Sequence, residues 1–328
     1  MHSVGSPLLW VGFTVFVLAM LFLDLSVFHR RSHAVSFKEA LGYSALWVGM
    51  AVLFGLGIYW RFGTESALQY AAGYLIEKSL SVDNLFVFLL IFTAFRIPAK
   101  FQHRVLFWGV LGALVMRGLF IGVGAALLQR FHWVLYVFGV ILLFSAVKMW
   151  RDRTFSENPK QGLAYRLFRR FFRYSPEIAG DHFWIEQNGK RLATPLFAAL
   201  VVVELCDVIF AVDSIPAIFA VTEDPFIVYT SNVFAILGLR SLYFLLSGAL
   251  HRFYLLKPAL AAVLGLVGIK LLVSDLYEVP IGVSLSVIGA ILTGAILGSI
   301  FWPLRFGPRR PSGRPRPPAG SAPSPLGT

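Results

Sequence analysis

The sequence predicts an all-α polytopic membrane protein with about nine transmembrane helices that contain a three-plus-three inverted-topology repeat. Hydrophobic residues make up 57% of the 328 residues and charged residues only 14%, which is too apolar for a soluble globular domain. Windows of roughly 20 apolar residues, the length that spans a bilayer, recur along the chain. Two of these windows carry matching groups of carboxylates, and buried membrane carboxylates usually mark a site or a pathway.

The apolar windows define the order of elements. They lie at about 8–28, 40–60, 66–95, 103–128, 132–150, 194–221, 228–250, 256–275 and 281–302. The first window is followed by Arg30 and Arg31, the reverse of a secretory signal, so we expect a spanning helix there.

These windows divide the chain into six parts: two N-terminal transmembrane helices (1–60), a first three-helix repeat (66–150), a cytoplasmic basic loop (151–193), a second three-helix repeat (194–275), a final transmembrane helix (281–302) and a disordered cytoplasmic tail rich in Pro and Arg (303–328).

The formal charge of +12 is divided unevenly between alternate loops. One side of the predicted bundle holds most Lys and Arg residues, whereas the other holds only Arg61 and Arg130 beside several acids. The positive-inside rule therefore places the amino terminus outside and the carboxyl tail in the cytoplasm. The charge thus indicates topology and not nucleic-acid binding.

The basic loop contains a segment with basic and aromatic residues at helical spacing, Tyr165-Arg-Leu-Phe-Arg-Arg-Phe-Phe-Arg173. This pattern predicts a helix that lies on the anionic inner leaflet of the lipid bilayer. A docking surface for a protein partner, formed by the loop at 151–193, is the alternative.

Two segments carry the acidic pattern that defines the repeat. Glu77 and Asp83 align with Asp207 and Asp213 at an offset of 130 residues. One window later Arg117 aligns with Arg240, and in the next window Lys148 aligns with Lys270. Because each copy has three spans, the two copies cross the membrane in opposite directions, as in many secondary transporters with sites near the midplane.

Pro216 follows the second group of acids. A proline removes a backbone hydrogen bond one turn back, here near Val212. We therefore expect local unwinding that brings Asp207 and Asp213 together and frees carbonyl oxygens for an ion.

The candidate ligands are all hard oxygen donors: Glu77, Asp83, Asn84, Glu204, Asp207, Asp213 and Ser214. Such oxygens suit Mg²⁺, Ca²⁺ and Mn²⁺, whereas His and thiolate would favour Zn²⁺ or Cu⁺. Five carboxylates against two arginines leave excess negative charge, which a cation or bound protons would offset. We interpret Arg117 and Arg240 as counter-ions; buried ion pairs that only fix helix packing are the alternative.

The long motifs resemble those of one known family. Glu204-Leu-Cys-Asp-Val-Ile-Phe-Ala-Val-Asp-Ser-Ile-Pro-Ala-Ile and Thr230-Ser-Asn-Val-Phe-Ala-Ile-Leu-Gly-Leu-Arg-Ser-Leu-Tyr-Phe resemble the TerC family of integral membrane proteins, and Glu77-Lys-Ser-Leu-Ser-Val-Asp-Asn-Leu-Phe-Val is similar to it. The likeness covers about residues 40–275 and implies metal homeostasis, with Mn²⁺ export as the activity. The family's motif residues fall, by position, on the seven candidate ligands, followed by Asn232 and Arg240.

We therefore expect a bacterial inner-membrane exporter of Mn²⁺ or a similar hard divalent cation, driven by proton entry. Its partners would be the metal ion, protons and the lipid bilayer, without nucleic acid or a permanently bound cofactor. A membrane scaffold in tellurite or metal resistance that transports nothing itself, and an oxyanion exporter, are the alternatives. We expect no enzyme, because no nucleophile–base pair or cofactor-cradling loop stands out.

Overall fold

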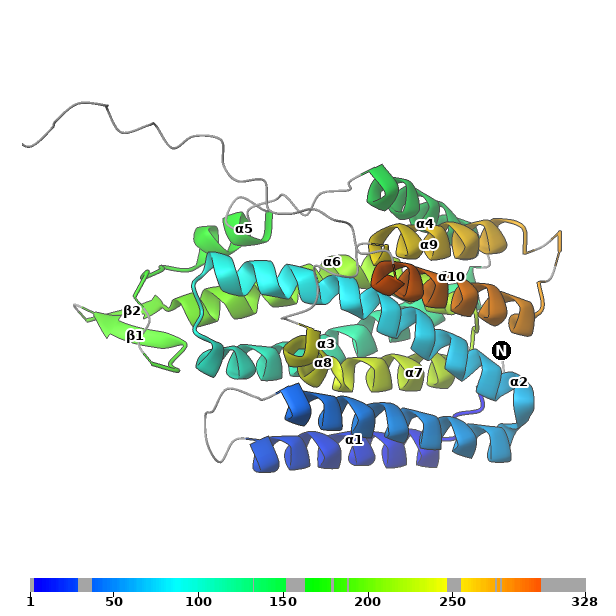
Figure 1. Ribbon diagram of the computed structural model, residues 1–328, viewed down its shortest axis with the longest axis horizontal. Coiled ribbons are helices and arrows are strands. Elements are labelled where there is room, and N and C mark those ends of the chain that lie inside the picture. The colour runs from blue at the N-terminus through cyan, green and yellow to red at the C-terminus, as the bar shows by residue number, and fades with distance from the viewer. Residues whose placement is uncertain are drawn as a thin grey trace, which may run out of the picture.

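The computed structural model is a bundle of helices that run side by side along its long axis (Figure 1). The structure describes residues 3–28, 37–131, 133–151, 163–177, 180–187, 189–246, 255–274, 276–277 and 279–301, without the side chains of 23–28, 37, 83, 86, 163–164 and 246. The tail predicted at 303–328 lies outside these residues.

The helices follow the apolar windows of the sequence. They are α1 (Pro7–Phe28), α2 (Phe37–Ala94), α3 (Ala99–Arg130), α4 (Val134–Arg151), α5 (Leu163–Phe171), α6 (Pro195–Phe219), α7 (Pro225–Leu237), α8 (Leu239–Leu246), α9 (Leu256–Leu272) and α10 (Ile281–Phe301). Within the described part, six helical segments are long and apolar enough to cross a membrane. The polytopic helical membrane class is therefore confirmed, whereas the count of nine spans stays a prediction.

Helix α2 folds back on itself at Gly63. This residue has φ 88° and ψ −178°, which lies outside the helical region and is open to glycine because it lacks a Cβ. The break separates a first arm, 37–62, from a second arm, 64–94. The first arm lies beside α1, and the second returns into the bundle (Figure 1).

Side-chain caps fix where α6 and α7 begin. Thr194 Oγ1 accepts a hydrogen bond from the Phe197 amide at 3.4 Å, and Pro195 occupies the first helical position. Asp224 caps α7 in the same way, with the Phe226 amide at 2.8 Å. Asp224 also accepts a hydrogen bond from the Val4 amide at 2.6 Å, so it ties the amino-terminal segment to α7.

Helix α6 stays helical through Pro216, so the expected unwinding is wrong. Pro216 lies in the last turn of α6, and the Ala220 amide still bonds to the Pro216 carbonyl at 3.0 Å. Because α6 continues, Asp207 and Asp213 keep their helical spacing and face different neighbours. Pro216 lacks only its own amide, which would have bonded to the Val212 carbonyl, and the following turn keeps its backbone hydrogen bonds, so the helix continues.

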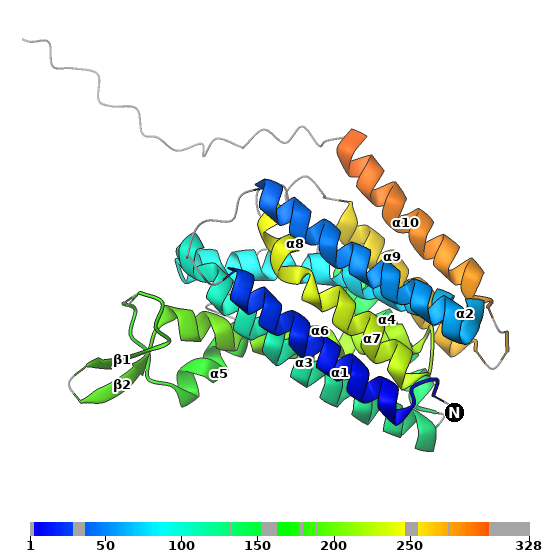
Figure 2. The ribbon, with the colours of Figure 1, turned by 90° about the horizontal axis from the view of Figure 1, so that it is seen from below.

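The basic loop forms a small module at one end of the bundle. The predicted helix is present as α5, but the sequence did not predict the antiparallel pair β1 (Trp184–Gln187) and β2 (Lys190–Ala193). Trp184 and Phe172 both pack on Phe197 of α6, with ring centroids 4.4 and 5.2 Å away. The hairpin extends beyond the helices in both views (Figures 1 and 2). We call this the hairpin end.

The helices of the bundle pack in a reciprocal pattern. Helix α3 packs on α6, whereas α7 and α8 pack on α2; α4 and α9 pack on each other. The α4–α9 crossing is close because it runs through glycines: a Cβ on Gly268 would lie 3.1 Å from the Gly139 carbonyl oxygen. Small residues allow such close approach between membrane helices, where no hydrophobic effect drives association.

Candidate functional site

Arg117 of α3 is the centre of a polar cluster inside the bundle. Its side chain is 1% exposed and forms ion pairs with Glu77 of α2 and Asp207 of α6. Nη2 and Nε of Arg117 donate to the two Asp207 carboxylate oxygens at 3.2 and 3.4 Å. This two-point contact fixes the orientation of the planar guanidinium group.

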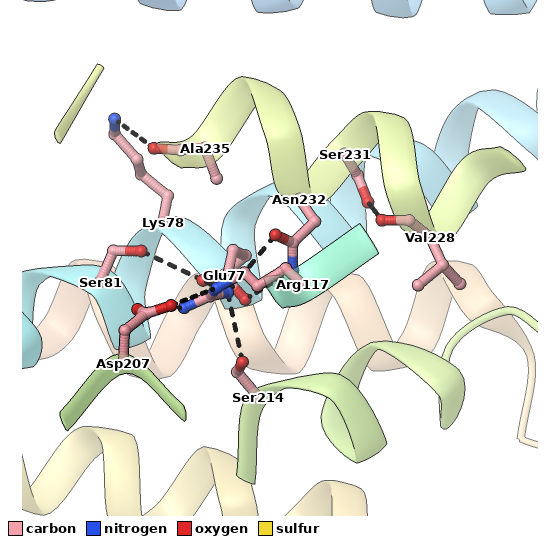
Figure 3. Close-up of polar contacts among 10 residues, drawn as sticks. All are labelled: Glu77, Lys78, Ser81, Arg117, Asp207, Ser214, Val228, Ser231, Asn232 and Ala235. Atoms are coloured by element: carbon pink, nitrogen blue, oxygen red, sulfur yellow. Dashed lines mark hydrogen bonds and ion pairs between the residues drawn. The ribbon is translucent and has the colours of Figure 1, made fainter. Parts of the chain in front are cut away.

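Three neutral side chains complete this cluster (Figure 3). Asn232 of α7 donates from Nδ2 to Glu77 Oε2 at 3.2 Å and accepts from Arg117 Nη1 at 3.4 Å. Ser81 Oγ donates to Glu77 Oε1 at 3.2 Å, and Ser214 Oγ accepts from Arg117 Nη1 at 3.3 Å. We call these six residues the Arg117 cluster: Glu77, Ser81, Arg117, Asp207, Ser214 and Asn232.

The Arg117 cluster is buried, so its charges depend on one another. Glu77 is fully buried and Asp207 is 4% exposed. A guanidinium group stays protonated, so one positive charge faces two carboxylates. Removing one partner of such a buried pair leaves an uncompensated charge, which is strongly destabilising. Moving Arg117 out of the cluster would therefore leave the two acids in need of another positive charge or of protons.

Lys78 is a polar residue next to the cluster that we did not predict. Its Nζ donates to the Ala235 carbonyl oxygen near the end of α7 at 3.1 Å (Figure 3). The last carbonyls of a helix lack intrahelical partners, and a cation there is favourable. The sequence feature that could have indicated this contact is a lysine directly beside Glu77 inside an apolar window.

Asp213 lies apart from the Arg117 cluster. Ser145 Oγ of α4 donates to Asp213 Oδ1 at 2.6 Å, so this carboxylate faces α4, whereas Asp207 faces Arg117 of α3. The two acids are six residues apart on one continuous helix, which places them about 9 Å apart along its axis.

Glu204 also lies outside the Arg117 cluster. Its carboxylate packs over Gly112 of α3, in a groove lined otherwise by apolar side chains. Asn84 is buried on α2 and Arg240 is buried on α8. The side chain of Asp83, another predicted ligand, lies outside the described residues.

The structure thus brings together Glu77, Asp207, Ser214, Asn232 and Arg117 of the predicted site. It separates Asp213 and Glu204 from them. Among the described side chains, no three of His, Cys, Asp and Glu are grouped so that they could hold a metal ion. The metal role of these residues stays a prediction.

Comparisons with known proteins identify similar membrane proteins over most of the chain. The model of the integral membrane protein TerC family matches residues 62–306. An uncharacterized membrane protein of Myxococcus xanthus is 57% identical over 298 residues, covering 91% of this chain and 93% of the relative. Proteins of Salmonella typhi and Escherichia coli K12 named putative membrane-bound redox modulator Alx are 50% and 48% identical, each covering 89% of this chain and 94% of the relative. No solved structure matches the chain.

Proposed function

Because the chain belongs to the TerC family of integral membrane proteins, we propose that it exports a divalent metal cation, with Mn²⁺ as the expected ion, by proton antiport. The observation that carries this proposal is the Arg117 cluster, in which one guanidinium group is held between Glu77 and Asp207 inside the membrane-spanning bundle. Charged side chains inside a membrane are energetically costly, so three buried charges usually fix helix packing or serve transport.

The guanidinium group of Arg117 acts as a stand-in for the transported cation. When it withdraws, Glu77, Asp207, Ser214 and Asn232 are left with carboxylate, hydroxyl and amide oxygens that face one another. Such hard oxygens are the ligands that Mn²⁺, Ca²⁺ and Mg²⁺ accept. Asp83 and Asn84 on α2, and Asp213 one to two turns along α6, would serve as further oxygens on the path of the ion.

Proton coupling follows from the same charges. If Arg117 moves away, the carboxylates of Glu77 and Asp207 cannot both stay ionised without another positive charge. A metal ion or protons would then take the place of the guanidinium group. Metal release and proton uptake then become alternatives at one site, which is the physical basis of antiport.

The packing supports an inverted repeat of three plus three helices. In this repeat α2 corresponds to α6, α3 to α7 and α8, and α4 to α9. If the two halves are exchanged, the contact of α3 with α6 becomes the contact of α7 and α8 with α2, which is also observed. The contact of α4 with α9 is unchanged by the exchange. A pseudo-two-fold axis in the membrane plane gives this exchange. The Arg117 cluster draws on both halves, as expected of a site at the repeat interface.

The charge distribution gives the orientation that we propose. Arg166 and Arg170 lie on α5 and Lys190 on β2, and Arg104 forms an ion pair with Asp181 just before β1. We assign this hairpin end to the cytoplasm of a bacterial inner membrane, with the amino terminus outside. On α5, Phe168 is buried on the bundle while Phe171 is 73% exposed. An exposed aromatic among arginines suits an anionic membrane surface better than a folded protein partner.

Two alternatives can be weighed against the geometry. An oxyanion exporter would need free positive charge, but Arg117 already faces two carboxylates. The name redox modulator of the Alx relatives suggests control of redox balance at the membrane. The sequence has a single cysteine, Cys206, which excludes an intramolecular disulfide. Export of a redox-active ion such as Mn²⁺ would connect metal transport with control of redox balance.

The proposal is tested by Mn²⁺ efflux from preloaded cells that express the chain or its Asp207→Asn and Asp213→Asn variants at equal amounts of folded protein. Asp213→Asn keeps an oxygen acceptor for the Ser145 hydroxyl, whereas Asp207→Asn keeps one oxygen for Arg117 and replaces the other with an amide nitrogen. We expect efflux from the parent chain and none from the variants. Efflux retained in both variants would end the site assignment, and no efflux from the parent chain would favour a scaffold without transport.

A further inference from the structure

A cavity of about 480 Å³ lies at the end of the bundle opposite the hairpin end. It is formed where the second arm of α2 begins, where α6 and α9 end, and where α10 begins. The turn of α2 and the start of α10 both lie at this end (Figures 1 and 2). Because membrane-spanning helices end near the bilayer surface, this cavity is at the level of the lipid headgroups. We call it the end cavity.

The end cavity has charged residues of both signs on its walls. Lys270, Glu65 and Glu223 all line it. None of these three residues forms an ion pair with a described residue. A cavity that holds separate positive and negative groups is complementary to a ligand that itself carries both signs.

An apolar groove of about 140 Å³ continues from the end cavity between α9 and α10. The two hollows share Lys270 and two valines, and apart from Lys270 and Ser284 the lining residues of the groove are apolar. Ile269 and Val283 on its walls are 55% and 53% exposed, so the groove is open to the hydrocarbon around the bundle. Its α9 residues, 266–273, cover about 10 Å of helix length, which is room for the first part of an acyl chain.

Lys270 connects the two hollows, because it lines both of them. A lysine can lay its aliphatic stem along an apolar surface and keep its ammonium group in polar surroundings. That ammonium group binds a phosphate as a point charge. Gln69 adds a neutral donor, since Thr222 Oγ1 donates to Gln69 Oε1 at 2.7 Å and leaves the amide nitrogen as a donor on the cavity wall.

The charges on the walls select a headgroup with a primary amine. One lysine and two glutamates give the end cavity a net charge of −1, which disfavours an anionic headgroup such as that of phosphatidylglycerol. The ammonium group of phosphatidylethanolamine has three N–H donors, whereas the quaternary ammonium group of phosphatidylcholine has none. Glu65 and Glu223 can therefore accept charge-assisted hydrogen bonds from the first headgroup but not from the second.

We propose that the end cavity and its groove bind one phospholipid of the phosphatidylethanolamine type. Lys270 holds the phosphate, Glu65 and Glu223 hold the amine, and an acyl chain enters the groove between α9 and α10. The two acids alone would also suit a cation that leaves the bundle, but a lysine in the same cavity and the adjoining apolar groove favour the lipid. The inference goes beyond the proposed transport and does not depend on it.

Native mass spectrometry of the full chain in detergent tests this site with dioleoyl lipids. The lipids are phosphatidylethanolamine, its N-methyl and N,N-dimethyl forms, and phosphatidylcholine, which keep the headgroup charge while the N–H donors are lost one by one. We expect binding to fall along this series, with phosphatidylethanolamine bound at least about tenfold more tightly than phosphatidylcholine, because hydrogen bonds to charged groups are lost.

Variants separate the parts of the site. Glu65→Gln/Glu223→Gln should remove the preference for the primary amine, whereas Lys270→Gln should weaken the binding of all four lipids. The matched controls are Glu186→Gln and Lys190→Gln on the hairpin, which should change neither.

A further pair of variants tests the groove. Val283→Phe should fill the groove and weaken lipid binding. Val140→Phe, at an exposed position on α4 outside the groove, should not.

Four results would overturn the proposal. The first is equal binding of phosphatidylethanolamine and phosphatidylcholine, and the second is an equal loss of binding in the hairpin variants. Displacement of the lipid by an equal concentration of glycerophosphoethanolamine, which has no acyl chains, would make a soluble zwitterion the ligand. An unchanged lipid preference in Glu65→Gln/Glu223→Gln together with slower Mn²⁺ efflux would make the end cavity a cation outlet. The binding measurement itself needs no transport, so its outcome is distinguishable from that of the proposed export.

Discussion

The guanidinium group of Arg117 on α3 holds the carboxylate of Asp207 on α6 by two hydrogen bonds, at 3.2 and 3.4 Å. The same guanidinium pairs with Glu77 on α2. One cation thus joins three helices of the bundle, and Asn232 adds a fourth by contacting both Arg117 and Glu77. Any event that moves Arg117 would therefore also loosen these helices, which would couple packing to the transport that we propose.

Arg117→Gln should destabilise the protein strongly. It leaves Glu77 and Asp207 buried without their counter-charge, and breaking a buried pair costs about 3–5 kcal/mol. Arg104→Gln is the matched control, since its ion pair with Asp181 is exposed and surface pairs contribute about 0–1 kcal/mol. Thermal unfolding in detergent measures both variants.

The double variant Arg117→Gln/Asp207→Asn isolates the pair itself. If the ion pair is the source of the loss, the double variant should be less destabilised than the sum of the two single variants. Simple additivity would mean that Arg117 and Asp207 stabilise the protein independently of each other.

Gly268→Ala should weaken the contact between α4 and α9. The added methyl group would lie 3.1 Å from both the Gly139 carbonyl oxygen and Leu142 Cβ. Overpacking of this kind typically costs about 1–3 kcal/mol. Gly265→Ala on the same helix is the control, because its methyl group meets only Ala146 at 3.7 Å. A lower midpoint of thermal unfolding for Gly268→Ala alone would support the close crossing, and equal midpoints would contradict it.

Asp224→Ala should free the amino-terminal segment and fray α7. The carboxylate caps the Phe226 amide and also holds the Val4 amide and the Ser3 hydroxyl. Loss of a helix N-cap costs about 0.5–2 kcal/mol. We expect faster proteolysis before α1 and a lower unfolding midpoint. Glu223→Ala, one residue earlier, should change neither, and an equal effect of both variants would refute the tether.

Arg166→Gln/Arg170→Gln should remove stabilisation by anionic lipid at the hairpin end. Both arginines are exposed on α5, and a basic residue near an anionic surface contributes about 1 kcal/mol. We expect the parent protein to unfold at a higher temperature in phosphatidylglycerol than in phosphatidylcholine, with a smaller difference in the variant. The matched control is Arg61→Gln/Arg130→Gln. Equal lipid dependence in both variants would point to a protein partner instead.

Much of the fold was predictable because membrane helices are apolar over a length set by the bilayer. The helix α5 was predictable for a related reason, since its basic and aromatic residues recur at helical spacing. The hairpin β1–β2 was not, because two strands of four residues carry no clear periodicity. Its position depends on Trp184 packing against Phe197, a contact between distant elements.

The candidate site was predictable as a set of residues but not as an arrangement. Intramembrane charges alone pointed to Glu77, Arg117 and Asp207. Which acid faces Arg117 depends on helix rotation and crossing. The expected unwinding at Pro216 was wrong because a proline removes a single backbone hydrogen bond, and the helix around it keeps the others. With α6 continuous, Asp213 faces Ser145, and Glu204 packs over Gly112 in a groove between α3 and α6.

The most direct test of the central claim is Mn²⁺ flux into liposomes that contain the purified chain and a metal-sensitive dye, with and without a pH gradient. We predict flux that depends on the gradient and disappears in Asp213→Asn, a variant that keeps an acceptor for Ser145 and loses only the charge. Absence of flux for Mn²⁺, Ca²⁺ and Mg²⁺ from folded protein, or flux unchanged in Asp213→Asn, would contradict the account.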